Sequence, residues 1–141
     1  MAKYTLLNNV VRFAAKYSDD PRLQVGACLV SGKQHTFGTN RFLSIPDGYT
    51  KEQLVADREL KLKHITHAEA DALLKSNSAE GSTIYVNYTP CIGCAQKIVA
   101  AGVKAVVVSK CADEAVALRW KASWQEAIDL FAANGVEYSE Q

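Results

Sequence analysis

Two short motifs limit what this chain can fold into more than any other part of its sequence. They are His67-Ala68-Glu69 and, further along the chain, Pro90-Cys91-Ile92-Gly93-Cys94. One imidazole and two thiols can occupy three corners of a tetrahedral zinc ion and leave the fourth for water. Glu69 then remains as a carboxylate with no bond to the metal, which is typical of a hydrolytic site and not of a structural zinc clip. The motifs therefore predict a catalytic Zn²⁺ held by His67, Cys91 and Cys94, with Glu69 as the catalytic residue.

Size and charge agree with a small enzyme that is free of membranes. A chain of 141 residues fits one domain, and its 16 basic and 15 acidic side chains leave a net charge of +1. This balance lacks the basic bias that dominates nucleic-acid binding. No apolar run approaches the roughly 18 residues of a membrane helix, and the first residues lead into an amphipathic segment, not a secretory signal. We therefore expect a cytoplasmic protein with neither membrane nor nucleic acid as a partner.

The apolar pattern alternates between helical and strand periods along the chain. The expected elements are a helix before the Ser18-Asp19-Asp20-Pro21 break, a hairpin at 23–30 and 35–40, a helix from 66, a strand at 83–87, a helix at 91–101, a strand at 103–108, a helix at 122–134 and a strand at 136–138. The apolar run at 103–108 follows a helical crossover, which predicts a parallel neighbour in a sheet covered on both faces. The sum predicts an α/β fold, a three-layer α/β/α sandwich around a five-stranded mixed sheet.

Local features place the motif residues at helix starts. Thr66 and Thr89 are the expected N-caps of the two helices that carry the motifs. His67 and Glu69 are two residues apart and point about 200° apart on a helix, so His67 is assigned to the metal and Glu69 to the substrate side. Gly26, inside an expected strand, indicates either a close approach to its backbone or a bulge, with equal weight.

The irregular stretch 41–64 is expected to be helical in part over 51–63. A connection of this length is functional, mobile or simply a solvated link.

A redox role or a structural zinc site for these cysteines and histidines accounts for fewer of the motif residues than a catalytic zinc site does. A redox role for Cys91 and Cys94 leaves His67 and Glu69 without a function, and a structural zinc requires a fourth protein ligand. We expect Cys28 to be a core residue, Cys111 a surface thiol, and His35 and His64 ordinary polar residues.

With these motifs in place, the chain resembles the cytidine deaminase superfamily, and within it the deoxycytidylate (dCMP) deaminases. Ser18-Asp19-Asp20-Pro21 and the following Val25-Gly26-Ala27 resemble the S-x-D-P…V-G-A segment of these enzymes, and Gly38 to Phe42 resembles their G-Y-N-G-F-P loop. Asp57-Arg58-Glu59 is similar to their D-R-E run, and residues 120–138 are similar to their closing helix and strand. Nearly the whole chain is covered, which implies a cytidine deaminase-like fold with residues 1–141 as a single zinc-dependent deaminase domain.

The resemblance also implies a reaction and a set of contacts. It implies hydrolytic conversion of dCMP to dUMP with release of ammonia. In this reaction Glu69 would take the proton of the zinc-bound water, protonate N3 and later carry a proton to the departing amino group. Asn40 matches the asparagine that contacts the sugar, while Ala68, Val25 and Gly26 would line the base. Tyr88 would form a wall of the pocket, although a tyrosine at a strand end is as often a packing residue. Enzymes of this kind are commonly homo-oligomers.

One departure from the family pattern bears on the substrate. The family has H-A-E-x-N-A, whereas Asp71 stands here in place of the asparagine. A carboxylate that faces the pocket would repel a phosphate unless an Arg or Lys neutralises it, and Arg41, with Arg58 and Lys63 as further candidates, could supply that charge. The alternatives are deaminases of a nucleoside, a free base or a modified cytosine nucleotide, a tRNA adenosine deaminase, and a non-enzymatic zinc module that would have no need of Glu69.

Overall fold

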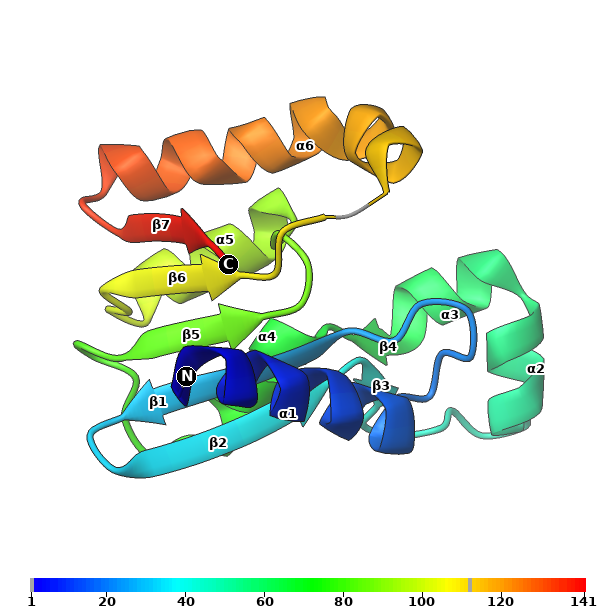
Figure 1. Cartoon of the computed structure of the whole chain (residues 1–141). Coiled ribbons are helices and arrows are strands. Elements are labelled where there is room, and N and C mark those ends of the chain that lie inside the picture. The colour runs from blue at the N-terminus through cyan, green and yellow to red at the C-terminus, as the bar shows by residue number, and fades with distance from the viewer. Residues whose placement is uncertain (1, 112) are drawn as a thin grey trace.

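A five-stranded sheet forms the centre of the computed structural model, which describes residues 2–111 and 113–141 (Figure 1). Its strand order is β2-β1-β5-β6-β7, with β1 antiparallel to both β2 and β5 and with β5, β6 and β7 mutually parallel. The strands are β1 (Gly26–Ser31), β2 (Gln34–Thr39), β5 (Thr83–Val86), β6 (Ala105–Val108) and β7 (Glu137–Glu140). The sheet is therefore mixed, and the apolar run that forms β6 has parallel neighbours, as the sequence predicts.

Helices cover the two faces of this sheet. Helix α1 (Ala2–Tyr17) packs on β1, β2 and β5, whereas α4 (Ala68–Lys75), α5 (Ile92–Ala100) and α6 (Glu114–Ala133) lie side by side on the opposite side, as Figure 1 shows. The main core fills the space between the sheet and these three helices. Its buried residues are Ala27, Leu29, Ala68, Ala72, Ile84, Val86, Ala95, Ile98, Val103, Val106, Val108, Ala127, Phe131 and Val136. The predicted three-layer α/β/α sandwich is thus confirmed.

Coverage of the sheet is incomplete on the side of α1, so the prediction of a sheet covered on both faces is wrong for β6 and β7. No described helix lies over these two strands on that side. Instead, an open hollow is lined by Thr83, Tyr85, Ala105, Val107, Glu137, Tyr138, Ser139 and Gln141. On this side Thr83, Tyr85 and Ala105 are partly exposed, whereas Val107 is buried.

Glycines allow helices to approach the hairpin from both sides. A Cβ atom on Gly26 would lie 2.4 Å from the carbonyl oxygen of Val10 in α1, and one on Gly38 would lie 2.4 Å from the backbone nitrogen of Ala72 in α4. The close-approach interpretation of Gly26 is therefore correct, and the approaching element is α1. Contact through Gly38 sets the position of α4, whose first turn carries Glu69.

The stretch 41–64 has more structure than a loop. Strands β3 (Arg41–Phe42) and β4 (Ile65–Thr66) pair with each other and enclose α2 (Lys51–Ala56) and α3 (Arg58–His64). Two ion pairs tie these helices to the turn after α1, from Lys51 to Asp19 at 2.6 Å and from Lys61 to Asp20 at 3.1 Å. The partial helicity expected at 51–63 is confirmed.

The largest differences from the predicted boundaries are at the starts of α6 and β1. Helix α6 begins at Glu114 and not at 122, because the side chain of Asp113 accepts hydrogen bonds from the N–H groups of Ala115 and Val116 and caps the helix. Strand β1 begins at Gly26, three residues later than expected. Within the part of the chain that the structure describes, no helix has the length and apolar character needed to cross a membrane.

Candidate metal centre

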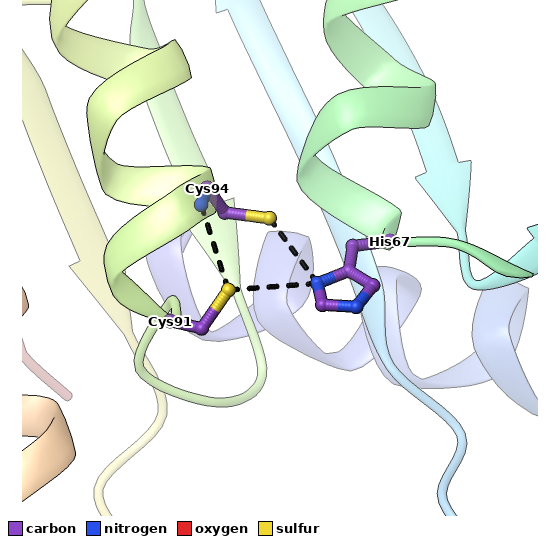
Figure 2. A group of neighbouring side chains, drawn as sticks. All are labelled: His67, Cys91 and Cys94. Carbon is purple, nitrogen blue, oxygen red and sulfur yellow. Dashed lines mark hydrogen bonds between the residues drawn. The ribbon is translucent and has the colours of Figure 1, made fainter. Parts of the chain in front are cut away.

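The side chains of His67, Cys91 and Cys94 meet where two helices begin. His67 directly precedes α4 and Cys91 directly precedes α5, and these helices are neighbours. Nδ1 of His67 lies 3.6 Å from Sγ of Cys91 and 3.3 Å from Sγ of Cys94 (Figure 2). All three ligand atoms lie within 4.8 Å of one another. The fold therefore brings together side chains that are up to 27 positions apart in sequence.

These distances fit a tetrahedral zinc ion. With Zn–S bonds of about 2.3 Å and a Zn–N bond of about 2.0–2.1 Å, tetrahedral angles separate nitrogen from sulfur by about 3.6 Å. Within residues 2–111 and 113–141, no other group of His, Cys, Asp and Glu side chains is placed to hold a metal. Cys28 is buried in β1, where burial raises the pKa of its thiol to about 12, and Cys111 lies after β6. The donor set thus provides three protein ligands, as in catalytic zinc sites.

The N-cap residues of α4 and α5 differ from the predicted ones, and both observed N-caps belong to the candidate metal cluster. Cys91, not Thr89, is the N-cap of α5, and its Sγ accepts a hydrogen bond from the N–H of Cys94 at 3.5 Å. His67, not Thr66, is the N-cap of α4 and makes no side-chain capping bond, so its ring is free for the metal. Thr89 instead pairs its hydroxyl with that of Tyr138 at 2.8 Å.

The two thiols differ in acidity when no metal is present. Hydrogen bonds from Cys94 and His67 lower the pKa of Cys91 to about 3, while the hydrogen bond to Cys91 and burial raise the pKa of Cys94. Cys91 is therefore a thiolate at neutral pH and the first anionic ligand of the cluster.

Glu69 lies in the first turn of α4 and is almost completely buried, with 4% of its surface exposed. Burial raises the pKa of its carboxyl to about 7 against the opposing effects of its own backbone N–H and the charge of His67. A carboxyl with this pKa can both accept and donate a proton near neutral pH.

The expected substrate contacts occupy different surroundings. Asn40 is 6% exposed, and its side chain donates to the carbonyl of Leu23 at 2.7 Å and accepts from the N–H of Val25 at 3.1 Å. Ala68 and Gly26 are buried, while Val25 is half-buried. Contacts of Asn40 with a sugar, and of Val25, Gly26 and Ala68 with a base, stay predictions.

Asp71 is fully buried between two cationic side chains. Its Oδ1 pairs with Nη2 of Arg41 at 2.9 Å, and its Oδ2 pairs with Nζ of Lys75 at 3.1 Å and accepts from the N–H of Thr39 at 3.1 Å. Burial alone raises the pKa of this carboxyl, but the hydrogen bonds from Arg41, Thr39 and Lys75 outweigh burial and hold it below its ordinary value. Arg41 thus does neutralise Asp71, and Lys75 adds a second positive charge. The four-residue spacing of Asp71 and Lys75 on one helix is a sequence signal for this second pair.

Tyr88 lines a cavity of about 420 Å³ at the carboxyl ends of β5 and β6. The other lining residues are Thr89, Ser109, Lys110, Cys111, Glu114, Ala117, Leu118, Lys121, Trp124, Gln125, Ile128 and Glu140. His67, Glu69 and Cys91 do not line this cavity. The contact of Tyr88 with a substrate stays a prediction.

Known proteins resemble this chain in sequence and in fold. The sequence profile described as "Cytidine and deoxycytidylate deaminase zinc-binding region" matches residues 2–110. A deoxycytidylate deaminase of Pongo abelii is 35% identical over 106 residues, which cover 70% of this chain and 59% of that relative. The "Uncharacterized deaminase in luxG 3'region" of Aliivibrio fischeri is 30% identical over 129 residues, which cover 91% of this chain and 86% of the relative. The chain therefore spans less than two thirds of the length of the first relative but most of the second.

The fold recurs in a solved structure, the dCMP deaminase from the cyanophage S-TIM5 in complex with dCMP and dUMP. It aligns with a TM-score of 0.70 over 99% of this chain and 96% of the phage chain, at 24% sequence identity. At this identity the likeness concerns the architecture alone.

Proposed function

Since this chain belongs to the family of cytidine and deoxycytidylate deaminases, we propose that it hydrolyses the amino group of a cytosine nucleotide, with dCMP as substrate and dUMP and ammonia as products. The observation that carries this proposal is the cluster of His67, Cys91 and Cys94 together with the buried carboxyl of Glu69. The choice of dCMP follows the name of the relative from Pongo abelii.

The residues of the cluster have separate roles in this reaction. His67, Cys91 and Cys94 would hold the zinc, which when bound supplies a water whose pKa is lowered towards about 7. Glu69 would accept a proton from the attacking water, deliver one to N3 of cytosine, and later carry one to the amino group, which leaves as ammonia. A pKa of about 7 suits this carboxyl to both directions of proton transfer.

The surroundings of Asp71 remove one objection to a nucleotide as substrate. Arg41 and Lys75 offset its single negative charge and leave the group with a net charge of +1 (two positive and one negative). Asp71 therefore offers no bare carboxylate to repel a phosphate.

We further propose that residues 1–141 act as one deaminase domain of a cytoplasmic homo-oligomer. Free cysteines of the kind that would hold zinc are typical of a reducing compartment. Large apolar side chains on the surface support self-association, among them Leu43, Ile45, Tyr49, Leu62, Leu74, Leu118 and Trp120. Sedimentation velocity over a range of concentrations tests the oligomer, and a monomer at every concentration would contradict it.

The substrate is tested by measuring ammonia release from the zinc-loaded protein. The substrates to compare are cytosine, deoxycytidine, dCMP, CMP, dCTP and their 5-substituted forms. We expect dCMP to give the highest kcat/KM. Preference for deoxycytidine would contradict the nucleotide assignment, and absence of ammonia release from every substrate would contradict deaminase activity.

A further inference from the structure

Asn87 uses its side chain to hold the backbone where the chain enters β1, at Gln24 and Gly26. It follows directly after β5, and its Oδ1 accepts a hydrogen bond from the N–H of Gly26 at 2.9 Å. Its Nδ2 donates to the carbonyl of Gln24 at 3.0 Å, and its own backbone N–H donates to the carbonyl of Gly26 at 3.3 Å. One side-chain amide thus pairs with two residues of an extended chain, as the backbone of a neighbouring strand would.

The side-chain amide of Asn40 binds the neighbouring residues of the same extended segment from its opposite edge. Its amide pairs with the carbonyl of Leu23 and the N–H of Val25, at 2.7 Å and 3.1 Å. Polar groups of successive residues in an extended chain point to opposite sides, so Asn40 takes residues 23 and 25 while Asn87 takes residues 24 and 26. We call residues 23–26, which end at the first residue of β1, the entry segment. The side chains of Asn40 and Asn87 bind the entry segment from both sides, in addition to the backbone hydrogen bonds from Asn40 to Val25 and from Asn87 to Gly26.

The entry segment contains two of the residues expected to line the base, Val25 and Gly26. Asn87 also lies four positions before Cys91, in the chain that leads from β5 to the metal ligands. Its amide therefore connects the expected substrate wall directly to the loop that delivers Cys91 and Cys94. Gly26 has no side chain to restrict its backbone, so a hydrogen bond to its N–H has a large effect on its conformation.

We propose that Asn87 is a positioning residue for the substrate, which fixes the entry segment relative to the loop that carries the metal ligands. This inference rests on the proposed deaminase function. Asn87 touches neither the metal ligands nor the reacting atoms; it acts through the backbone of Gln24 and Gly26. Its loss is expected to weaken substrate binding more than it slows the chemical step.

The test compares Asn87→Ala with Asn77→Ala, which alters an exposed asparagine in the connection between α4 and β5. For Asn87→Ala we expect KM for dCMP to rise about tenfold and kcat to change by less than about threefold, since two hydrogen bonds are lost. Asn87→Asp keeps the acceptor for the N–H of Gly26 and loses the donor to Gln24, so its KM should lie between those of Asn87→Ala and the wild type. Asn77→Ala should match the wild type.

Two readouts that need no substrate accompany the kinetics. Zinc content should be the same in all four proteins, and amide hydrogen exchange at Gly26 should be about tenfold faster in Asn87→Ala while exchange at Val106 in the core is unchanged. An unchanged KM in an active Asn87→Ala protein would overturn the positioning role, as would unchanged exchange at Gly26. A wild-type protein that deaminates no cytosine compound would instead refute the proposed function and, with it, this inference.

Discussion

Glu69 is the residue whose burial matters most for the chemistry. A carboxyl in the first turn of a helix is ordinarily solvated and ionised, but this one is 4% exposed and its pKa is raised to about 7. It lies two residues after His67, at the mouth of the helix that presents the proposed zinc ligand.

Replacement of Glu69 by Gln should remove the proton carrier and leave the metal cluster intact. We expect kcat to fall by a factor of about 10²–10⁴, because general acid–base catalysis contributes about that much. Zinc content measured by atomic absorption and the melting temperature should stay close to those of the wild type. Turnover at a rate close to that of the wild type would contradict the mechanism.

Asp71 is a second residue whose role depends on its neighbours. Sequence alone leaves open whether it faces the pocket, whereas the structure buries it completely between Arg41, Lys75 and the N–H of Thr39. These contacts join α4 to the end of β2 and to β3. The carboxylate therefore stabilises the position of the helix that carries Glu69.

Loss of Arg41 should destabilise the fold, because the buried carboxylate of Asp71 loses one of its two cations. We expect Arg41→Ala to lower the free energy of unfolding by about 1–3 kcal/mol, a range discounted for the partial exposure of the guanidinium. Urea denaturation measures this change. Arg58→Ala, at an exposed position of α3, is the matched control and should change stability by less than about 0.5 kcal/mol. Equal effects of the two substitutions would show that the pair with Asp71 contributes nothing.

At the scale of elements, two glycines determine how closely helices pack on the hairpin. Gly26 admits the backbone of α1 on one face of β1, and Gly38 admits the backbone of α4 on the other face of the sheet. Both contacts are with backbone atoms, which cannot rotate away as a side-chain terminus could. The spacing between the sheet and the helix that carries Glu69 thus depends on a missing Cβ.

Gly26→Ala and Gly38→Ala should each force a helix away from the sheet. We expect each substitution to destabilise the protein by about 1–3 kcal/mol, the usual cost of overpacking, and Gly38→Ala to reduce kcat as well because it displaces α4. The control is Asn77→Ala, at an exposed position in the connection between α4 and β5, which should change neither stability nor activity. Thermal unfolding and ammonia release measure both effects. A neutral Gly38→Ala would mean that α4 can shift without loss.

At the scale of the whole molecule, two carboxylates connect distant segments and make the fold sensitive to acid. Asp20 links the turn after α1 to Lys61 of α3, and Asp71 links α4 to Arg41 of β3. Burial raises the pKa of both carboxyls, but hydrogen bonds to each carboxylate outweigh burial. Asp20 accepts from the N–H groups of Arg22 and Leu23 and from Lys61. Asp71 accepts from Arg41, from the N–H of Thr39 and from Lys75. Both pKa values therefore lie below 3.8 in the folded protein.

A lowered pKa in the folded state means that the unfolded chain binds protons more readily. The stability contributed by Asp20 and Asp71 is therefore fully present above about pH 5 and is lost as the pH falls through 4 towards the folded-state pKa values. We expect the melting temperature of the wild type to drop between pH 5 and pH 3. The melting temperature of Asp71→Asn should drop less steeply over the same interval. Asp47→Asn, in an exposed turn, should follow the wild type. Parallel curves for wild type and Asp71→Asn would contradict the linkage.

Much of the fold could be predicted from the sequence because its signals are local. The apolar run of β6 indicated a buried parallel strand, and the two motifs indicated adjacent helix starts. Local signals also existed for two features that the prediction missed: Asp113 is an N-cap residue ahead of α6, and the Asp71–Lys75 spacing indicates an ion pair.

The remaining features were decided by contacts between residues far apart in the chain. The candidate metal donors, the proposed catalytic carboxyl and the layered sheet could be predicted from the sequence, since they follow from side-chain chemistry and from periods of a few residues. Two other pairings could be seen only in the folded structure: Arg41 neutralises Asp71 from 30 positions away, and Asn87 holds Gly26 across 61 positions. Such pairings have no periodic signature, because they depend on which surfaces meet when helices pack on the sheet.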